Sequence, residues 1–178
     1  MKKSNKKISV AIVLYVFSFH TFSNAQTEEK KLPSVSVKTP KGETLNIQSI
    51  SNNGKPIIIS IWETTCKPCI NELDAIQENY ADWKKETGVK VVAISIDDTR
   101  SSSSAPVLAN AKGWDFDIYL DVNKDVKRAM NFSYCPQTYL IDGSGNIVWQ
   151  SSSYASGDEE QLYSLVQKLS KGEKIEAK

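Results

Sequence analysis

The pattern of apolar and polar positions divides the chain into short segments with two different periods. Residues 57–62 are apolar except for Ser60, and residues 91–96 form a second run that is apolar except for Ser95, so both predict strands covered on both faces. Between them, apolar side chains recur at intervals of 4, 3, 4 and 3 residues, namely at Cys69, Leu73, Ile76, Tyr80 and Trp83. This spacing keeps them on one face of a helix, which Pro68 can open and Gly88 can end. The order strand, helix, strand predicts a βαβ unit with parallel pairing.

Weaker patterns on either side of this unit predict the remaining elements. Residues 35–37 and 44–47 alternate around a Pro-Lys-Gly turn, which is typical of a β-hairpin at the N-terminal end of the domain. After the unit, the pattern predicts a helix over 101–112 interrupted at Pro106, a strand over 118–120, a short helix over 124–131, two strands over 138–141 and 147–149, and a last helix with a Ser156–Glu159 capping box. The predicted fold is α/β, with a central mixed sheet, helices on both faces and an N-terminal hairpin extension.

The ends of the chain have a different composition from its middle. Residues 1–25 combine four lysines, an apolar run over 8–19 and small residues before Ala25, the pattern of a signal peptide. The run is shorter than the roughly 20 residues of a membrane span, although an uncleaved anchor is an alternative. We expect a polar linker over 26–33, one folded domain over 34–171 and a charged tail over 172–178. We therefore predict a periplasmic or otherwise exported protein, soluble after cleavage behind Ala25.

Charge and histidine content exclude several classes of function. The only histidine is His20, inside the predicted signal peptide. Without it, serine–histidine hydrolysis, histidine general-base catalysis and histidine metal sites are excluded for the exported chain. The charges are scattered singly along the sequence, which argues against a nucleic-acid or anionic-lipid partner.

The three cysteines carry the candidate chemistry. An odd number in an oxidising compartment leaves at least one of Cys66, Cys69 and Cys135 outside any internal pairing. The segment Cys66-Lys67-Pro68-Cys69 follows a buried strand and opens a helix, at the edge where α/β sheets place their sites. The helix terminus favours an anion at Cys66 by about 0.3–2 kcal/mol, and Lys67 adds a positive charge. We therefore predict that Cys66 attacks as a thiolate and that Cys69, on the buried face, resolves the mixed disulfide.

Two other interpretations of the Cys-x-x-Cys motif are weaker. Half of a zinc site would need a second cysteine pair or histidines at suitable spacing. A structural disulfide that closes so short a loop would constrain the unfolded chain little. Redox chemistry is favoured because the motif lies inside a βαβ unit.

Three features resemble the thioredoxin superfamily, and more closely the TlpA/ResA-like exported thiol–disulfide oxidoreductases. They are Trp62 followed by the Cys66–Cys69 motif, the stretch that begins Cys135-Pro136, and the closing hairpin over 142–148. The resemblance implies a thioredoxin fold in which Pro136 is cis and packs beside the disulfide. It also implies that Cys135 lies near Cys66 with its backbone free to pair with an extended substrate.

Glu72 matches an acid that tunes the active-site thiols in ResA-like members. The alternative for Glu72 is a solvated acid favoured by the helix dipole. The chain departs from the family pattern at Glu63 and Thr65, where Ala and Trp are usual, and at Ser60, where Asp or Asn is frequent. The largest departure is Cys135, in a position where the family usually has Thr, Val or a similar small residue.

Cys135 has two interpretations. Buried cysteine packs as a small apolar residue, so the substitution can be a packing change only. Alternatively Cys135 forms a three-thiol site with Cys66 and Cys69, either by intercepting Cys66 in another disulfide or by holding Cu(I) or a similar ion.

The resemblance implies an enzyme that reduces disulfides in exported proteins, apocytochromes c among them. Such a reductant must be recharged, and a membrane electron donor is expected to do this. We expect a monomer without a cofactor. The alternatives are a metal-binding or metallochaperone protein using Cys66, Cys69 and Cys135, and a thiol peroxidase, which is weakened because Thr65-Cys66 lacks a proline-led loop.

Overall fold

A computed structural model describes residues 30–175 of the chain. The predicted signal peptide, the first four residues of the predicted linker and the last three residues of the tail lie outside the described residues. Within the described part, no helix is both long enough and apolar enough to cross a membrane.

The described residues form one mixed sheet in the order β2-β1-β5-β4-β3-β6-β7. Its strands are β1 (Ser36–Lys38), β2 (Thr44–Asn46), β3 (Ile57–Trp62), β4 (Lys90–Ser95), β5 (Asp117–Leu120), β6 (Gln137–Ile141) and β7 (Ile147–Ser151). The three strands β3, β4 and β5 run parallel, while β6 pairs antiparallel with both β3 and β7. The predicted mixed sheet and its parallel βαβ unit are confirmed.

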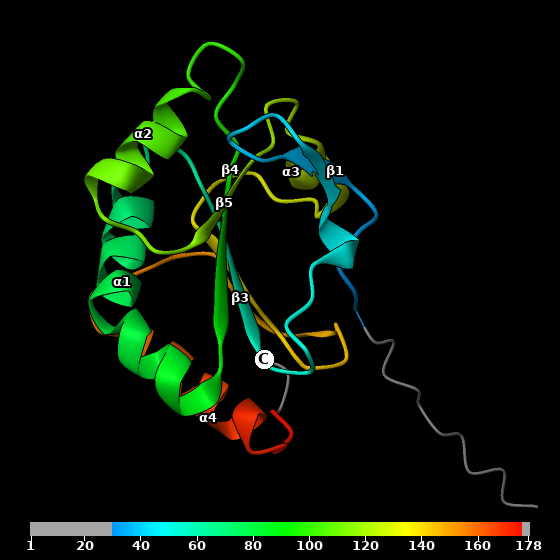
Figure 1. The fold of residues 1–178 in the computed structure, drawn as a ribbon, viewed down its shortest axis with the longest axis vertical. Coiled ribbons are helices and arrows are strands. Elements are labelled where there is room, and N and C mark those ends of the chain that lie inside the picture. The colour runs from blue at the N-terminus through cyan, green and yellow to red at the C-terminus, as the bar shows by residue number, and fades with distance from the viewer. Residues whose placement is uncertain (1–29, 176–178) are drawn as a thin grey trace, which may run out of the picture.

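Helices cover both faces of this sheet, as predicted. They are α1 (Lys67–Thr87), α2 (Ser104–Ala111), α3 (Asp125–Ala129), α4 (Asp158–Ser170) and a short 3₁₀ helix over Ile47–Ser49. Figure 1 shows α1, α2 and α4 on one face and α3 on the other. Because side chains of a strand alternate between faces, Ile58 and Trp62 pack toward α1 whereas Ile59 and Ile61 pack toward α3.

The predicted N-terminal hairpin is confirmed and extends the sheet. Strands β1 and β2 pair antiparallel, with Val37 opposite Leu45. One further pairing, Lys38 with Leu120, joins β1 to β5. The hairpin therefore lies at the sheet edge farthest from β7, away from the strand β3 that leads to the cysteine motif.

Three details of the prediction are wrong. The helix predicted over 101–112 begins at Ser104, so Pro106 lies in its first turn, where no backbone donor is needed, and does not interrupt it. The last helix is capped by Gly157 without a side-chain hydrogen bond, so Ser156 is not its N-cap. The end of the predicted linker is part of the domain, because Leu32 is buried in the core and Lys31 pairs with Asn146 in the turn between β6 and β7.

Candidate active site

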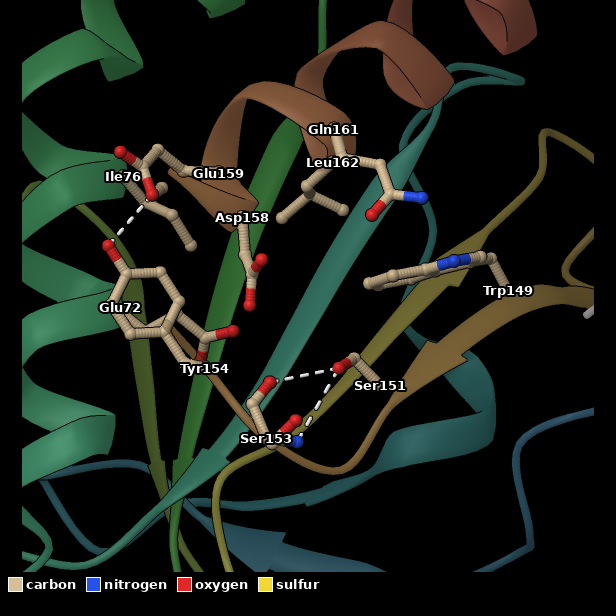
Figure 2. Close-up of a pocket in the computed structure, with 10 residues that line it drawn as sticks. All are labelled: Glu72, Ile76, Trp149, Ser151, Ser153, Tyr154, Asp158, Glu159, Gln161 and Leu162. Atoms are coloured by element: carbon tan, nitrogen blue, oxygen red, sulfur yellow. Dashed lines mark hydrogen bonds between the residues drawn. The ribbon is translucent and has the colours of Figure 1, made fainter. Parts of the chain in front are cut away.

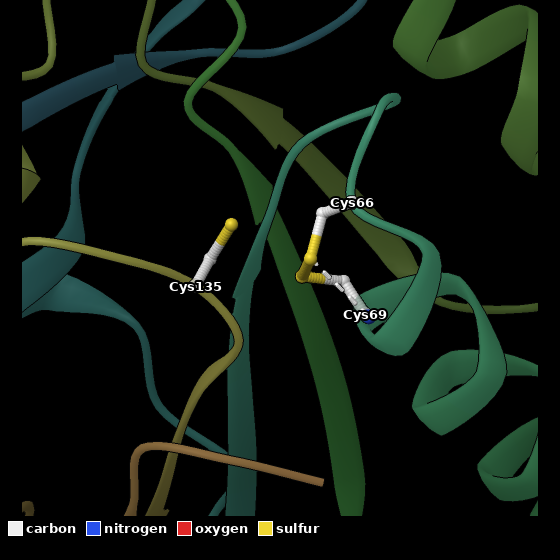
Figure 3. Close-up of side chains that lie close together, drawn as sticks. All are labelled: Cys66, Cys69 and Cys135. Carbon is white, nitrogen blue, oxygen red and sulfur yellow. Dashed lines mark hydrogen bonds between the residues drawn. A yellow bond between two sulfur atoms is a disulfide. The ribbon is translucent and has the colours of Figure 1, made fainter.

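The two cysteines of the motif lie at the start of α1 and form a disulfide (Figure 3). Cys66 is the N-cap residue, and its Sγ accepts a hydrogen bond of 3.3 Å from the backbone N–H of Cys69. Cys66 is half-buried, whereas Cys69 is completely buried. The position of the pair at the helix terminus was predicted from the sequence, and a reactant from solvent meets Cys66 first.

The residues between the cysteines allow the helix to start at this point. Pro68 lies in the first turn of α1, where its missing N–H removes no helical hydrogen bond. The first main-chain bond of the helix runs from the N–H of Ile70 to the carbonyl of Cys66, at 3.1 Å. Lys67 and Pro68 are both exposed, so they form the outer rim of the site.

An aspartate that the sequence analysis missed holds the loop before Cys66. Asp97 is 5 % exposed and accepts hydrogen bonds from the Thr64 hydroxyl at 2.7 Å and the Thr64 backbone N–H at 3.0 Å. The Ser95 hydroxyl donates a third bond to it, at 2.7 Å. Asp97 lies two residues after the end of β4, at the same sheet edge as the end of β3. An acid just after a buried parallel strand was the available signal for a residue at this edge.

Trp62 lies behind the disulfide in the core. It is completely buried, shares the apolar cluster of Cys69, and meets Trp114 edge to face with 5.1 Å between ring centroids. The Trp114 indole N–H in turn donates to Asp74 at 2.9 Å. This packing gives the start of α1 a rigid floor.

Glu72 is a buried acid one turn beyond Cys69 on α1. It is 4 % exposed, and its carboxylate accepts hydrogen bonds from Thr138 at 2.6 Å and Ser60 at 3.1 Å. Burial raises the pKa of Glu72 to about 7, although the two donors act in the opposite direction. The interpretation of Glu72 as a solvated acid is therefore wrong, and the unusual Ser60 serves as its hydrogen-bond donor.

A small pocket of about 70 Å³ leads from the surface near α4 to Glu72 (Figure 2). Tyr154 lines it and donates a hydrogen bond of 2.7 Å to Glu159. Burial and this bond raise the pKa of Tyr154, so the phenol stays protonated at neutral pH. Asp158 also lines the pocket, and its negative charge adds to the raised pKa of Glu72. The pocket brings the buried carboxyl close to solvent without exposing Cys69.

The third cysteine faces the disulfide from the other side (Figure 3). The sulfurs of Cys66, Cys69 and Cys135 all lie within 4.8 Å of one another. The peptide bond between Cys135 and Pro136 is cis. Cys135 is half-buried, and burial raises the pKa of its thiol, with a further contribution from the negative charge of Glu63. The structure thus brings together three thiols that are separated by up to 69 positions in the sequence.

One ion pair lies on this side of the disulfide. Lys124 contacts Glu63 at 2.9 Å, and both side chains are about one-third exposed. The hydrogen bond from Lys124 to Glu63 raises the pKa of the lysine. Glu63, which departs from the family pattern, is therefore partly neutralised beside the thiols.

Comparisons with known proteins agree on the fold and the family. Residues 29–150 match the AhpC/TSA family. The chain is 26% identical over 178 residues to the thiol-disulfide oxidoreductase ResA of Bacillus thuringiensis (strain Al Hakam), covering 95% of this chain and 99% of the relative. It is 46% identical to a thioredoxin-like protein from Porphyromonas gingivalis known from a solution structure, with a TM-score of 0.72. That match covers 79% of this chain and 92% of the Porphyromonas chain.

The structure of a putative thiol:disulfide interchange protein DsbE from Chlorobium tepidum matches with a TM-score of 0.68 at 19% identity. The match covers 80% of this chain and 96% of the Chlorobium chain, and it supports the fold alone. The family match spans most of the described domain, including both cysteines of the motif and the stretch around Pro136. The chain therefore belongs to the AhpC/TSA family, and the Cys66–Cys69 disulfide at the start of α1 makes it a thioredoxin-fold thiol–disulfide oxidoreductase.

Proposed function

We propose that this protein is exported and reduces disulfides in other exported proteins, with Cys66 as the attacking thiol and Cys69 as the resolving thiol. The observation that carries the proposal is the unequal access of the two sulfurs. Cys66 is half-buried at the helix terminus, while Cys69 is completely buried beneath it. A substrate disulfide can therefore meet only Cys66.

The first step is attack by the Cys66 thiolate on one sulfur of the substrate. A bond forms between Cys66 Sγ and that sulfur, the substrate S–S bond breaks, and the second substrate sulfur leaves as a thiolate that takes up a proton. The backbone N–H of Cys69 donates to Cys66 Sγ, and the start of α1 favours negative charge, so both stabilise the attacking anion.

The second step releases the substrate. Cys69 loses its proton and attacks Cys66 Sγ, which forms the Cys66–Cys69 disulfide, breaks the bond between Cys66 Sγ and the first substrate sulfur, and frees that sulfur as a thiolate that takes up a proton. Two electrons have then passed to the substrate, and the oxidised protein is left in the state that the structure describes. The Cys66–Cys69 disulfide must therefore be reduced again before the protein can reduce another substrate disulfide.

We assign Glu72 to the proton of Cys69. The two residues are three positions apart on α1, which places them on the same helix face. A carboxyl with a pKa of about 7 can accept a proton at neutral pH and return it to solvent. The pocket beside Tyr154 offers the contact with solvent that this transfer needs.

The direction of the reaction and the partners come from the resemblance to ResA-like proteins. A protein reductant in an oxidising compartment needs an electron source, and a membrane electron donor is the proposed one. The proposed substrates are exported proteins with disulfides, including apocytochromes c. We propose that the protein acts as a monomer.

Two serine variants test the assignment of the thiols. Cys66→Ser should lose insulin reduction, because the attacking sulfur is replaced by a much weaker nucleophile. Cys69→Ser should still attack but should accumulate a mixed disulfide with the substrate, visible as an added mass that dithiothreitol removes. Both variants exchange the same atom, so each is the control for the other. Full activity of Cys66→Ser, or a mixed disulfide at Cys69 in that variant, would contradict the proposal.

A separate measurement tests export. The protein expressed from its full sequence should be found outside the cytoplasm with Gln26 as its first residue, by intact mass and N-terminal sequencing. An intact leader on a membrane-bound protein would favour the anchored alternative.

A further inference from the structure

We infer that the reduced protein binds one Cu(I) ion through the thiolates of Cys66, Cys69 and Cys135. The three sulfurs come from the N-cap of α1, its first turn and the segment before β6, and they converge on one point (Figure 3). This metal site shares two thiols with the proposed exchange reaction but does not depend on it.

The distances suit one ion with three sulfur ligands. Thiolates bound at about 2.3 Å from a metal ion are about 4 Å apart in a trigonal plane. The sulfurs of the cluster already lie within 4.8 Å of one another. The Cys66 and Cys69 sulfurs are 2.01 Å apart in the disulfide, so after reduction they must separate by about 2 Å, through side-chain rotation, to complete the triangle.

The donor set selects a soft ion of low coordination number. Thiolates favour Cu(I) and Zn²⁺ among the common metals, but zinc sites normally take four ligands. The described residues contain no histidine, and the cluster has no other cysteine. Three sulfurs alone are therefore a closer match for Cu(I) than for Zn²⁺.

The surroundings of the cluster favour a bound anionic complex and allow an ion to enter. The N-terminus of α1 points at Cys66, and Cys69 donates its N–H to that sulfur, which disperses thiolate charge. Cys66 and Cys135 are both half-buried, so the ion has a path from solvent, while Cys69 closes the inner side.

Metal binding and disulfide formation exclude each other in this site. Binding replaces the thiol protons with Cu(I) and transfers no electrons, whereas oxidation joins two of the same sulfurs. A loaded site therefore has no free Cys66 to attack a substrate. The third thiol turns a two-cysteine redox motif into a site whose reactivity copper can block.

Anaerobic titration of the fully reduced protein with Cu(I), in competition with a chromophoric chelator, tests this inference. We expect one ion per chain and loss of iodoacetamide labelling at all three cysteines. Cys135→Ser and the apolar variant Cys135→Val should each bind Cu(I) at least about tenfold more weakly. Oxidised wild-type protein, which has only one free thiol among the three, should not compete with the chelator.

Three results would overturn the site. They are unchanged Cu(I) affinity in both Cys135 variants, labelling of Cys135 at the same rate with and without copper, and Zn²⁺ affinity equal to that for Cu(I). Insulin reduction by metal-free protein is measured in parallel. If the protein binds Cu(I) as expected but does not reduce insulin, the proposed function alone is contradicted. If it reduces insulin but does not bind Cu(I) as expected, the metal site alone is contradicted.

Discussion

The Cys66–Cys69 disulfide separates two regions with different solvent access and charge. We call the first the open side; it contains Cys135 and the Glu63–Lys124 ion pair, whose side chains are all partly exposed. We call the second the buried side; it contains Glu72 with its hydrogen-bond donors Ser60 and Thr138, all less than 5 % exposed. One covalent bond thus lies between a region of partly exposed side chains and a region of buried ones, whose acid Glu72 meets solvent only through the small pocket beside Tyr154.

The difference between the two sides shows how the fold gives the chemically identical side chains of Cys66 and Cys69 different roles. On the open side, charges are screened by water, so an ion pair contributes little to stability. On the buried side, desolvation dominates and raises the pKa of Glu72 to about 7. Attack is therefore assigned to the open side and proton handling to the buried side. Four predictions test this division, from the largest expected effect to the smallest.

The pH dependence of stability should show the buried acid directly. The pKa of Glu72 is raised from 4.5 to about 7, so the folded protein binds this proton more tightly than the unfolded chain. The resulting stabilisation is complete below pH 4.5 and is lost as the pH rises to about 7, a change of about 3 kcal/mol. Chemical denaturation of the oxidised protein should show that Glu72→Gln removes this decline.

Glu78→Gln is the control for that experiment, because Glu78 is an exposed acid on the same helix. It should keep the wild-type pH dependence. If Glu72→Gln and wild type lose stability in parallel between pH 5 and pH 8, the buried side does not hold a proton as described.

The same substitution should slow the release of substrate. Without a carboxyl to accept the Cys69 proton, attack on the mixed disulfide should fall by about 10²-fold at pH 7, the low end of general acid–base effects. Stopped-flow measurement of mixed-disulfide decay separates this step from the first attack, which should change little. An equal loss in both steps would indicate a structural disturbance of α1.

Removal of either hydrogen-bond donor should move the titration of Glu72 upward. Thr138→Val and Ser60→Ala each remove a bond that lowers the pKa of Glu72, and the Thr138 contribution is the larger. The inflection in the pH–rate profile of mixed-disulfide decay should therefore shift to higher pH, more for Thr138→Val. A shift to lower pH would show that these hydroxyls favour the protonated acid.

The smallest effect is expected on the open side. Lys124→Ala leaves the charge of Glu63 unpaired near Cys135, which should slow alkylation of that thiol at pH 8. The stability loss should be below about 1 kcal/mol, since the pair is partly exposed. Lys112→Ala breaks a comparably exposed pair with Asp74 and is the matched control. It should cost similar stability but leave the Cys135 labelling rate unchanged.

Local patterns were sufficient for the parts of the fold that depend on neighbours in sequence. The 4-3-4-3 spacing after Cys69 predicted α1, and the βαβ order predicted parallel pairing of β3 with β4. The capping of the last helix was predicted less well, because Gly157 takes the N-cap position through its backbone, which no side-chain pattern reveals.

Long-range contacts decided the character of the site. The sequence placed Cys66 and Cys69 at a helix terminus but could not show that Asp97, 31 positions after Cys66, holds the loop before it. Nor could it decide between a solvated and a buried Glu72, because burial depends on Thr138 and α4 closing over α1.

The sequence by itself determined the redox motif and the helix that carries it, because both depend on residues within a few turns of one another. Only the tertiary structure decided that Glu72 is buried, that Asp97 holds the loop before Cys66, and how close the Cys135 sulfur lies to the pair. Those properties depend on distances between segments far apart in the chain, and a pKa or a metal site follows from such distances.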